Sequence, residues 1–199
     1  MANSRVAGFI SFLVLASCTL SFPSTLRAQE KSLIAIMPLP AHVMQGEGEF
    51  LIDGGFGIAL KGYKDPRLER ARQRFLDTLS RETGIPLWRE AILNSPHFTV
   101  QTSGPSAAVQ QLGEDESYHL EITTTEVQLT APNPIGVIRG LQTFLQMVRI
   151  TAKGFSVPAV TVDDKPRFPW RGLLIDSGHR FVPISTVKRN LDGMEVVKS

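Results

Sequence analysis

The chain has 199 residues, of which 42% are hydrophobic and 20% are charged. This composition is typical of a globular protein, and the length is enough to bury one core and to begin a second. The 21 basic and 19 acidic residues leave a formal net charge of +2 and are spread along the chain without runs. Because phosphate binding needs Lys and Arg clustered on one face, the sequence indicates no nucleic-acid partner.

The N-terminus has the pattern of an export signal. A single positive charge at Arg5 is followed by the apolar run 6–15. This run is shorter than the about 20 residues that cross a bilayer, and it fits the hydrophobic part of a secretion signal. We therefore expect residues 1–28 to be a signal peptide and the mature protein to be exported to the periplasm or the extracellular space.

Two processing routes are open for this signal. Residues 15–18 (Leu-Ala-Ser-Cys) match a bacterial lipobox, in which removal of residues 1–17 leaves a lipidated Cys18 that attaches the protein to a membrane. Alternatively, cleavage after Ala28 leaves no anchor, although Leu26 is larger than such a site prefers. Cys18 is the only cysteine of the chain, so we expect no internal disulfide.

In residues 31–163, the positions of turn residues and apolar runs are typical of one compact α+β domain. Short apolar or alternating runs bounded by turn residues predict strands at 33–37, 49–52, 57–60, 97–102, 118–123, 126–131 and 155–162. The fifth and sixth of these runs are separated by a short turn, which predicts a hairpin with one buried face.

Two amphipathic helices are predicted within the same domain. The first has Asp65 as its cap and Pro66 as its first residue, and it ends at Gly84. The second runs from Pro134 to about Arg149. The simplest packing of these elements is a sheet with both helices on one face, because each helix then buries its apolar stripe in a common core.

A second, different unit is predicted over residues 164–199. The run Asp-Asp-Lys-Pro at 163–166 marks the boundary, and the unalternating apolar run 172–175 is typical of a strand buried on both sides in a parallel sheet. Ser185 stands where a helix cap belongs. The apolar face of the helix that follows consists of Val187, Leu191, Met194 and Val197. One such strand and helix cannot cover their own apolar faces, so we expect other elements to pack against them.

No complete catalytic constellation is present in the chain. The sequence lacks a G-x-S-x-G elbow, a Walker loop and a G-x-G-x-x-G turn between a strand and a helix. The 4 histidines are scattered and have no partner cysteine, so the sequence predicts no metal site. The pair Asp163-Asp164 precedes Lys165-Pro166, which favours a solvated turn over a catalytic pair of carboxylates.

Charged residues flank the predicted strand 172–175 at both ends. Arg171 precedes it and Asp176 follows it, and Trp170 stands beside the arginine. A guanidinium presents several donors in one plane, so Arg171 is suited to hold two neighbouring sugar hydroxyls. The alternative is that Arg171 contacts Asp176 or the backbone and only fastens the junction between the two units.

The stretch 167–181, which continues through 182–184 and 188–194, resembles the opening of the catalytic barrel in family-20 β-N-acetylhexosaminidases. Such openings read as an aromatic residue before Arg-Gly, an apolar strand that ends in Asp, a His/Arg/Phe cluster, a Pro, and a helix with K-R-N-L-D-x-M. The preceding domain is also similar. Residues 36–40 (Ile-Met-Pro-Leu-Pro) resemble the family's entry strand, and 140–146 (Gly-Leu-Gln-Thr-Phe-Leu-Gln) resemble the helix of its non-catalytic α+β domain.

This resemblance implies a fold and an activity. The fold is an α+β auxiliary domain followed by the truncated start of a (β/α)8 barrel, whose first βα unit is residues 164–199. The family removes terminal N-acetylhexosamine from oligosaccharides, with the substrate's own acetamido group as nucleophile, so no cofactor is expected. Arg171 corresponds to the arginine that holds the hydroxyls of that terminal sugar. Asp176 and His179 fall in a cluster beside the site, although many members have Arg-His where this chain has His179-Arg180.

The family's catalytic Asp–Glu pair belongs to an H-x-G-G-D-E motif late in the barrel, which would lie beyond Ser199. We therefore expect no glycoside hydrolysis by the isolated chain. The alternative is a non-catalytic secreted sugar-binding or scaffolding protein that ends at Ser199. The sequence leaves open the natural glycan and the preference between GlcNAc and GalNAc, because the selecting residues would also lie further along.

Overall fold

The computed structural model describes residues 34–87 and 97–198, which belong to one compact unit. The predicted signal peptide and Cys18 lie outside the described residues. The strands are β1 (His42–Leu51), β2 (Ile58–Gly62), β3 (Phe98–Thr102), β4 (Tyr118–Ile122), β5 (Val127–Ala131), β6 (Arg149–Thr151) and β7 (Gly154–Asp164). The helices are α1 (Pro66–Thr83), α2 (Pro134–Gln146) and α3 (Ile184–Val196). None of the described helices is long and apolar enough to span a membrane.

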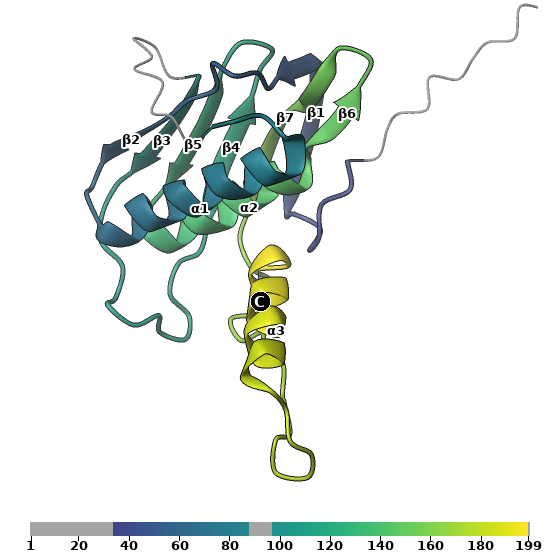
Figure 1. Cartoon of the computed structure of the whole chain (residues 1–199). Coiled ribbons are helices and arrows are strands. Elements are labelled where there is room, and N and C mark those ends of the chain that lie inside the picture. Colours follow the sequence, from purple (N-terminus) through teal and green to yellow (C-terminus); the bar gives the residue numbers. More distant parts are fainter. Residues whose placement is uncertain (1–33, 88–96, 199) are drawn as a thin grey trace, which may run out of the picture. The chain divides into compact units, whose positions relative to one another are not determined.

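The strands form one mixed, seven-stranded sheet in the order β1-β7-β4-β5-β3-β2, with β6 beside β7. Strands β2, β3 and β5 are parallel to their neighbours in this set, and the remaining pairs are antiparallel. Figure 1 shows α1 and α2 side by side on the same face of the sheet, as the sequence predicts. The predicted hairpin is confirmed as β4 and β5.

Helix α1 has the ends that its sequence predicts. The Asp65 side chain accepts a hydrogen bond from the Arg67 backbone N–H at 2.7 Å, and Pro66 occupies the first turn. Gly84 ends the helix in the left-handed conformation, with a φ of 71° that costs glycine nothing. Helix α2 has the same design at its start, because Asn133 accepts from the backbone N–H groups of Ile135 and Gly136.

The core between the sheet and the two helices is centred on phenylalanine rings. Phe98 of β3 and Phe144 of α2 have ring centroids 5.2 Å apart, and Phe75 of α1 lies 5.5 Å from Phe144. All three side chains are at most 3% exposed. Contacts at these separations add to the stabilisation that burial of the rings gives.

At the start of the domain, one predicted strand is wrong and the next one begins earlier than predicted. Residues 34–37 form no strand, and β1 instead begins at His42 and continues through 46–48. The Gly-Glu-Gly there resembles a turn, but it is a bulge within the strand. The register against β7 shifts between Gln45 and Glu49, and Gly48 has a φ of 88°. Short β6 was also missed, because α2 ends at Gln146 instead of Arg149.

The predicted strand over 172–175 is wrong as well. These residues lie outside any helix or strand, and the Leu174 side chain is 93% exposed. The physical reason is that a strand needs a neighbour for its backbone groups, and within the described residues no strand pairs with this segment. Helix α3 forms, but it begins at Ile184 with Pro183 as its cap, so Ser185 is not the cap.

Candidate functional site

Arg171 is the sequence-predicted site residue that the structure places in the most organised surroundings. Its Nη2 donates to Oε2 of Glu116 at 2.7 Å. Its Nη1 donates to the carbonyl oxygen of Phe168 at 2.7 Å, and its Nε donates to that of Lys198 at 2.9 Å. The side chain is 17% exposed. Arg171 therefore links the α+β domain to the segment that follows it.

Glu116 lies in the loop just before β4, and its side chain is only 5% exposed. The oxygen that accepts from Arg171 also accepts from Nε of Arg139, on α2, at 2.7 Å. Neighbouring bonds fix this loop, because the carbonyl of Asp115 accepts from Asn133 Nδ2, and the Asp115 side chain accepts from the Ser117 N–H. A buried carboxylate is stable only when it is paired, and here it has two guanidinium partners.

A second polar cluster adjoins the first. Lys198 Nζ donates to Asp164 Oδ2 at 3.1 Å and to Tyr118 Oη at 2.8 Å. Tyr118 Oη also donates to Asp164 at 2.9 Å and lies 2.5 Å from the Thr143 hydroxyl. Burial raises the pKa of Tyr118, and burial lowers the pKa of Lys198 against the opposing effect of Asp164.

A cavity of about 180 Å³ lies at these clusters. Arg171, Glu116 and Lys198 line it together with apolar groups from Pro38 and Phe168. The mixture of an apolar wall with convergent polar groups is typical of small-molecule sites.

Asp176 and His179 lie in an exposed turn apart from these clusters. The Asp176 carboxylate accepts from the backbone N–H groups of Gly178 and His179, and it lies 2.5 Å from Nδ1 of His179. These hydrogen bonds, first of all the one from the His179 backbone, hold the pKa of Asp176 below its ordinary value. Neither side chain contacts Arg171, so the structure does not bring the three predicted residues together.

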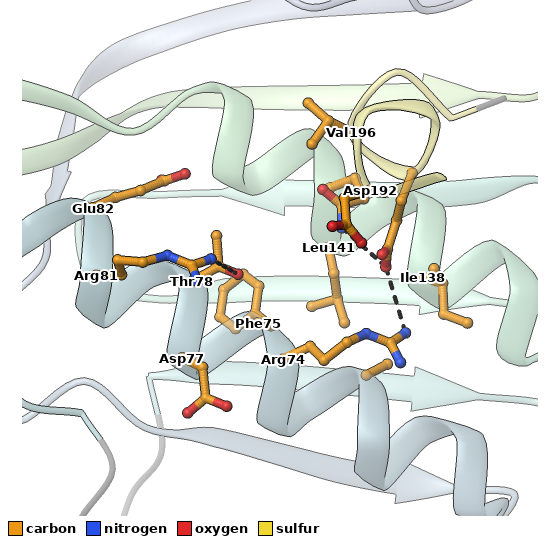
Figure 2. Close-up of a pocket in the computed structure, with 13 residues that line it drawn as sticks. Arg74, Phe75, Asp77, Thr78, Arg81, Glu82, Ile138, Leu141, Asp192 and Val196 are labelled. Carbon is orange, nitrogen blue, oxygen red and sulfur yellow. Dashed lines mark hydrogen bonds and ion pairs between the residues drawn. The ribbon is translucent and has the colours of Figure 1, made fainter. Parts of the chain in front are cut away.

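Figure 2 shows a second cavity, of about 440 Å³, between α1, α2 and α3. Phe75, Ile138 and Leu141 give it an apolar floor. Arg74 of α1 reaches across it to Glu195 of α3, with Nη2 and Oε1 3.4 Å apart. Its lining carries more acidic than basic side chains, and it contains none of the predicted site residues Arg171, Asp176 and His179. Among the described residues, no group of His, Cys, Asp or Glu is arranged to hold a metal ion.

The sequence indicates Arg171 but not the charged and polar residues that form the two clusters around it. These are Glu116, Arg139, Tyr118, Asp164 and Lys198. One signal was available: a buried guanidinium requires a carboxylate, and Arg139 stands on the apolar face of its helix, where it is 9% exposed. The acidic run 114–116, next to a predicted strand, contains the carboxylate that pairs with Arg139. Nothing in the spacing indicated that Lys198 would fold back onto the sheet.

Solved structures share this fold. A chitobiase from Flavobacterium johnsoniae matches 81% of the chain with a TM-score of 0.75 and 31% identity, over 25% of its own length. An N-acetyl-β-hexosaminidase from Streptomyces plicatus matches 82% with a TM-score of 0.67 and 25% identity, over 32% of its length. The α+β fold is therefore that of a domain in glycoside hydrolases. A family model, glycosyl hydrolase family 20, domain 2, matches residues 33–165. The chain belongs to this family.

Curated relatives extend the similarity beyond that domain. β-Hexosaminidase 3 of Arabidopsis thaliana is 28% identical over 217 aligned residues, which cover 99% of this chain and 39% of the relative. β-Hexosaminidase subunit A1 of Dictyostelium discoideum is 38% identical over 86 residues, which cover 42% of this chain and 16% of the relative. The chain thus corresponds to well under half the length of the relatives that it matches.

Proposed function

We propose that this chain is part of a β-N-acetylhexosaminidase, which removes terminal non-reducing N-acetylhexosamine from oligosaccharides by substrate-assisted, retaining hydrolysis. The observation that carries the proposal is the match of residues 33–165 to the family-20 domain. The alignment with a β-hexosaminidase over 99% of the chain supports it. No comparison favours the alternative of a sugar-binding or scaffolding protein without catalysis.

The proposal divides the chain into an auxiliary domain at 31–163 and the first βα unit of a catalytic barrel at 164–199. Two features of the second unit support this division. Leu173 and Leu174 are 57% and 93% exposed, and α3 has no buried residue. An apolar run and an amphipathic helix in this order suit a barrel, where neighbouring strands and helices cover them.

Arg171 is proposed to hold hydroxyls of the terminal sugar. Its support is the arrangement of donors at the 180 Å³ cavity that it lines with Phe168. A guanidinium is suited to bind sugar oxygens, because all of its polar hydrogens are donors, it has no acceptor, and it stays charged. Asp176 and His179 are proposed to act beside the site, where the paired carboxylate orients the imidazole.

Export is proposed from the apolar run 6–15, and lipidation of Cys18 from the lipobox pattern at 15–18. Both are tested by mass spectrometry of the protein recovered from cells. A mass that corresponds to residues 19–199 with Cys18 and its lipid supports attachment to a membrane. A chain that begins after Ala28 supports release, and an intact N-terminus in the cytoplasm contradicts export.

The catalytic proposal is tested at the gene and with the protein. The coding DNA is read past the codon for Ser199, and the longest product is assayed with 4-methylumbelliferyl N-acetyl-β-D-glucosaminide. We expect an open frame that reaches a His-x-Gly-Gly-Asp-Glu motif and a product that hydrolyses the substrate, whereas the 199-residue chain alone does not. Hydrolysis by the 199-residue chain contradicts the placement of the catalytic pair. A motif-bearing product without activity contradicts the proposed reaction.

A further inference from the structure

The guanidinium of Arg171 is held by groups from both sides of the domain boundary. Phe168 and Lys198 lie after the boundary and offer only backbone carbonyls. Glu116 lies before it and, in the described part of the chain, offers the only charged acceptor, at 2.7 Å. The guanidinium is a charged donor in all three bonds, but the bond to Glu116 also has a charged acceptor, so Glu116 has the largest share in fixing this side chain.

Glu116 is itself held within the auxiliary domain. Its side chain is 5% exposed, and the same oxygen is bound by Arg139. Arg139 is 11% exposed at its side chain and belongs to α2, whose start is tied to the Glu116 loop through Asn133. The auxiliary domain therefore presents a buried carboxylate that is already bound by Arg139, and Arg171 binds the same oxygen from the other side of the boundary.

The donor count leaves Arg171 with capacity for a ligand. A guanidinium has five N–H groups. Three of them donate to Glu116, Phe168 and Lys198, so two remain, one on Nη1 and one on Nη2. Within the described residues these two have no acceptor, and Arg171 lines the 180 Å³ cavity. Two donors on neighbouring nitrogens match two neighbouring hydroxyl oxygens of a sugar.

We propose that Glu116 is the positioning residue for Arg171, so that the auxiliary domain sets the arginine that binds the terminal N-acetylhexosamine. The inference rests on the proposed sugar-binding role of Arg171. It gives the auxiliary domain a part in substrate binding that acts through the position of Arg171. Glu116 holds the guanidinium in one orientation before the ligand arrives, which removes the cost of ordering a long side chain on binding.

The first measurement needs no variant. In the ¹⁵N-labelled 199-residue chain, NMR of the arginine Nε–H and Nη–H groups reports how fast each guanidinium rotates and exchanges with water. Arg180 is the internal reference, because it is exposed. We expect Arg171 to be at least about tenfold slower in exchange than Arg180, as fits a group with three hydrogen bonds. Equal rates for the two overturn the proposal.

The second measurement compares variants for sugar binding. Affinity for N-acetyl-D-glucosamine is measured by ligand-observed NMR in the wild type, Glu116→Gln and Glu116→Ala. The matched control is Glu49→Gln, which removes the charge of a carboxylate that pairs with Arg149 at 2.5 Å in another part of the sheet. We expect binding to weaken about tenfold in Glu116→Ala and less in Glu116→Gln, which keeps an acceptor oxygen, with no change in the control.

The outcomes separate this inference from the proposed function. Wild-type binding that persists unchanged in both Glu116 variants overturns the positioning role and leaves the role of Arg171 intact. A slow Arg171 guanidinium without any sugar binding overturns the sugar-binding role, whereas Glu116 still fixes the side chain. A third outcome is that Glu49→Gln lowers both the melting temperature and the affinity as much as the Glu116 variants do. In that case Glu116 contributes to stability alone, and the positioning role is overturned. If neither Glu116 variant folds, the wild-type exchange rates decide.

Discussion

The α+β domain and the segment 165–198 have similar apolar content, but the domain buries its apolar side chains and the segment leaves them exposed. Among the described residues, every buried hydrophobic side chain lies between Ile36 and Val162. In the later segment, Trp170 is 76% exposed and Phe181 is 85% exposed, and α3 buries none of its residues. Lys198 is the one residue of that segment that is buried, and it is charged.

This difference shows that an apolar pattern in the sequence identifies a surface that can be buried. Whether it is buried depends on whether other helices or strands pack against it. The domain contains two helices and a sheet that face one another, so each apolar stripe finds another one. The later segment has a helix and a short apolar run, and α3 lies beside α1 and α2 across the 440 Å³ cavity without burying any of its residues. Ionic contacts made by Arg171 and Lys198 hold it there, in place of a hydrophobic core.

The largest expected contrast is between two large-to-small substitutions. Phe144→Ala opens a cavity beside Phe75 and Phe98, and we expect it to lower the free energy of unfolding by about 3–5 kcal/mol. Leu174→Ala removes a side chain that is 93% exposed, and we expect a change below about 0.5 kcal/mol. Urea unfolding followed by tryptophan fluorescence and circular dichroism measures both. Similar losses in the two variants contradict the contrast.

Features that depend on local sequence are predicted well, whereas features that depend on distant partners are not. Helix α1 was predicted almost to the residue, because Asp65, Pro66 and Gly84 are local signals that act through their own backbone. The strand at 172–175 was predicted from apolar content alone, and it fails because pairing is not local. The bulge in β1 was missed for the related reason that only the register with β7 distinguishes it from a turn.

The candidate site was predictable in part. Arg171 was found through its place in a motif, but its partner Glu116 lies 55 residues away, and nothing local encodes that contact. The same holds for Lys198, which is 80 residues from Tyr118. Long-range ionic contacts leave only a weak trace in a single sequence, namely a charged residue on a face that is otherwise apolar. Arg139 is such a residue.

A glycine-to-alanine pair sharpens the comparison, because the expected effects have opposite signs. A Cβ at Gly136 of α2 would lie 2.2 Å from the backbone oxygen of Ser117. We expect Gly136→Ala to lower stability by about 1–3 kcal/mol through overpacking. Gly193 of α3 has no atom within 4 Å of its ideal Cβ. There we expect alanine to raise helix stability by roughly 0.5–1 kcal/mol.

Urea titration measures the first variant, and amide hydrogen exchange across 184–196 measures the second. Exchange is the better readout for Gly193→Ala, because α3 has few contacts with the core and can open without global unfolding. Slower exchange in α3 at unchanged global stability fits the comparison. A global stability gain would mean that α3 unfolds together with the domain.

The helix caps offer a third and smaller contrast. Asn133 accepts from two backbone N–H groups at the start of α2 and donates to the carbonyl of Asp115. We expect Asn133→Ala to cost about 0.5–2 kcal/mol in thermal or urea unfolding. Ser185→Ala is the matched control, because α3 has no side-chain cap and Ser185 is exposed. A loss of comparable size at Ser185 contradicts the described start of α3.

The smallest expected effect is a dependence of stability on pH. The side-chain hydrogen bond from Arg67 holds the pKa of Asp65 below its ordinary value of 3.8. A carboxyl whose pKa is lower in the folded state stabilises that state above the unfolded pKa, and it loses this contribution as the pH falls through the folded pKa. The contribution of Asp65 is therefore complete near pH 6 and is lost below about pH 4.

Asp65→Asn keeps the cap oxygen but removes the charge from the start of α1. We expect it to lower the free energy of unfolding by less than about 1 kcal/mol at pH 6, the range of a charge at a helix terminus. The difference from wild type should shrink towards zero as the pH falls below 4. Asp176→Asn is the control, since the pKa of that carboxyl is also lowered but the residues of its turn, 177–181, are exposed. Because its charge acts outside the cooperative domain, the Asp176 variant should unfold like wild type at every pH. A pH-dependent loss there would show that residues 176–179 are coupled to the domain after all.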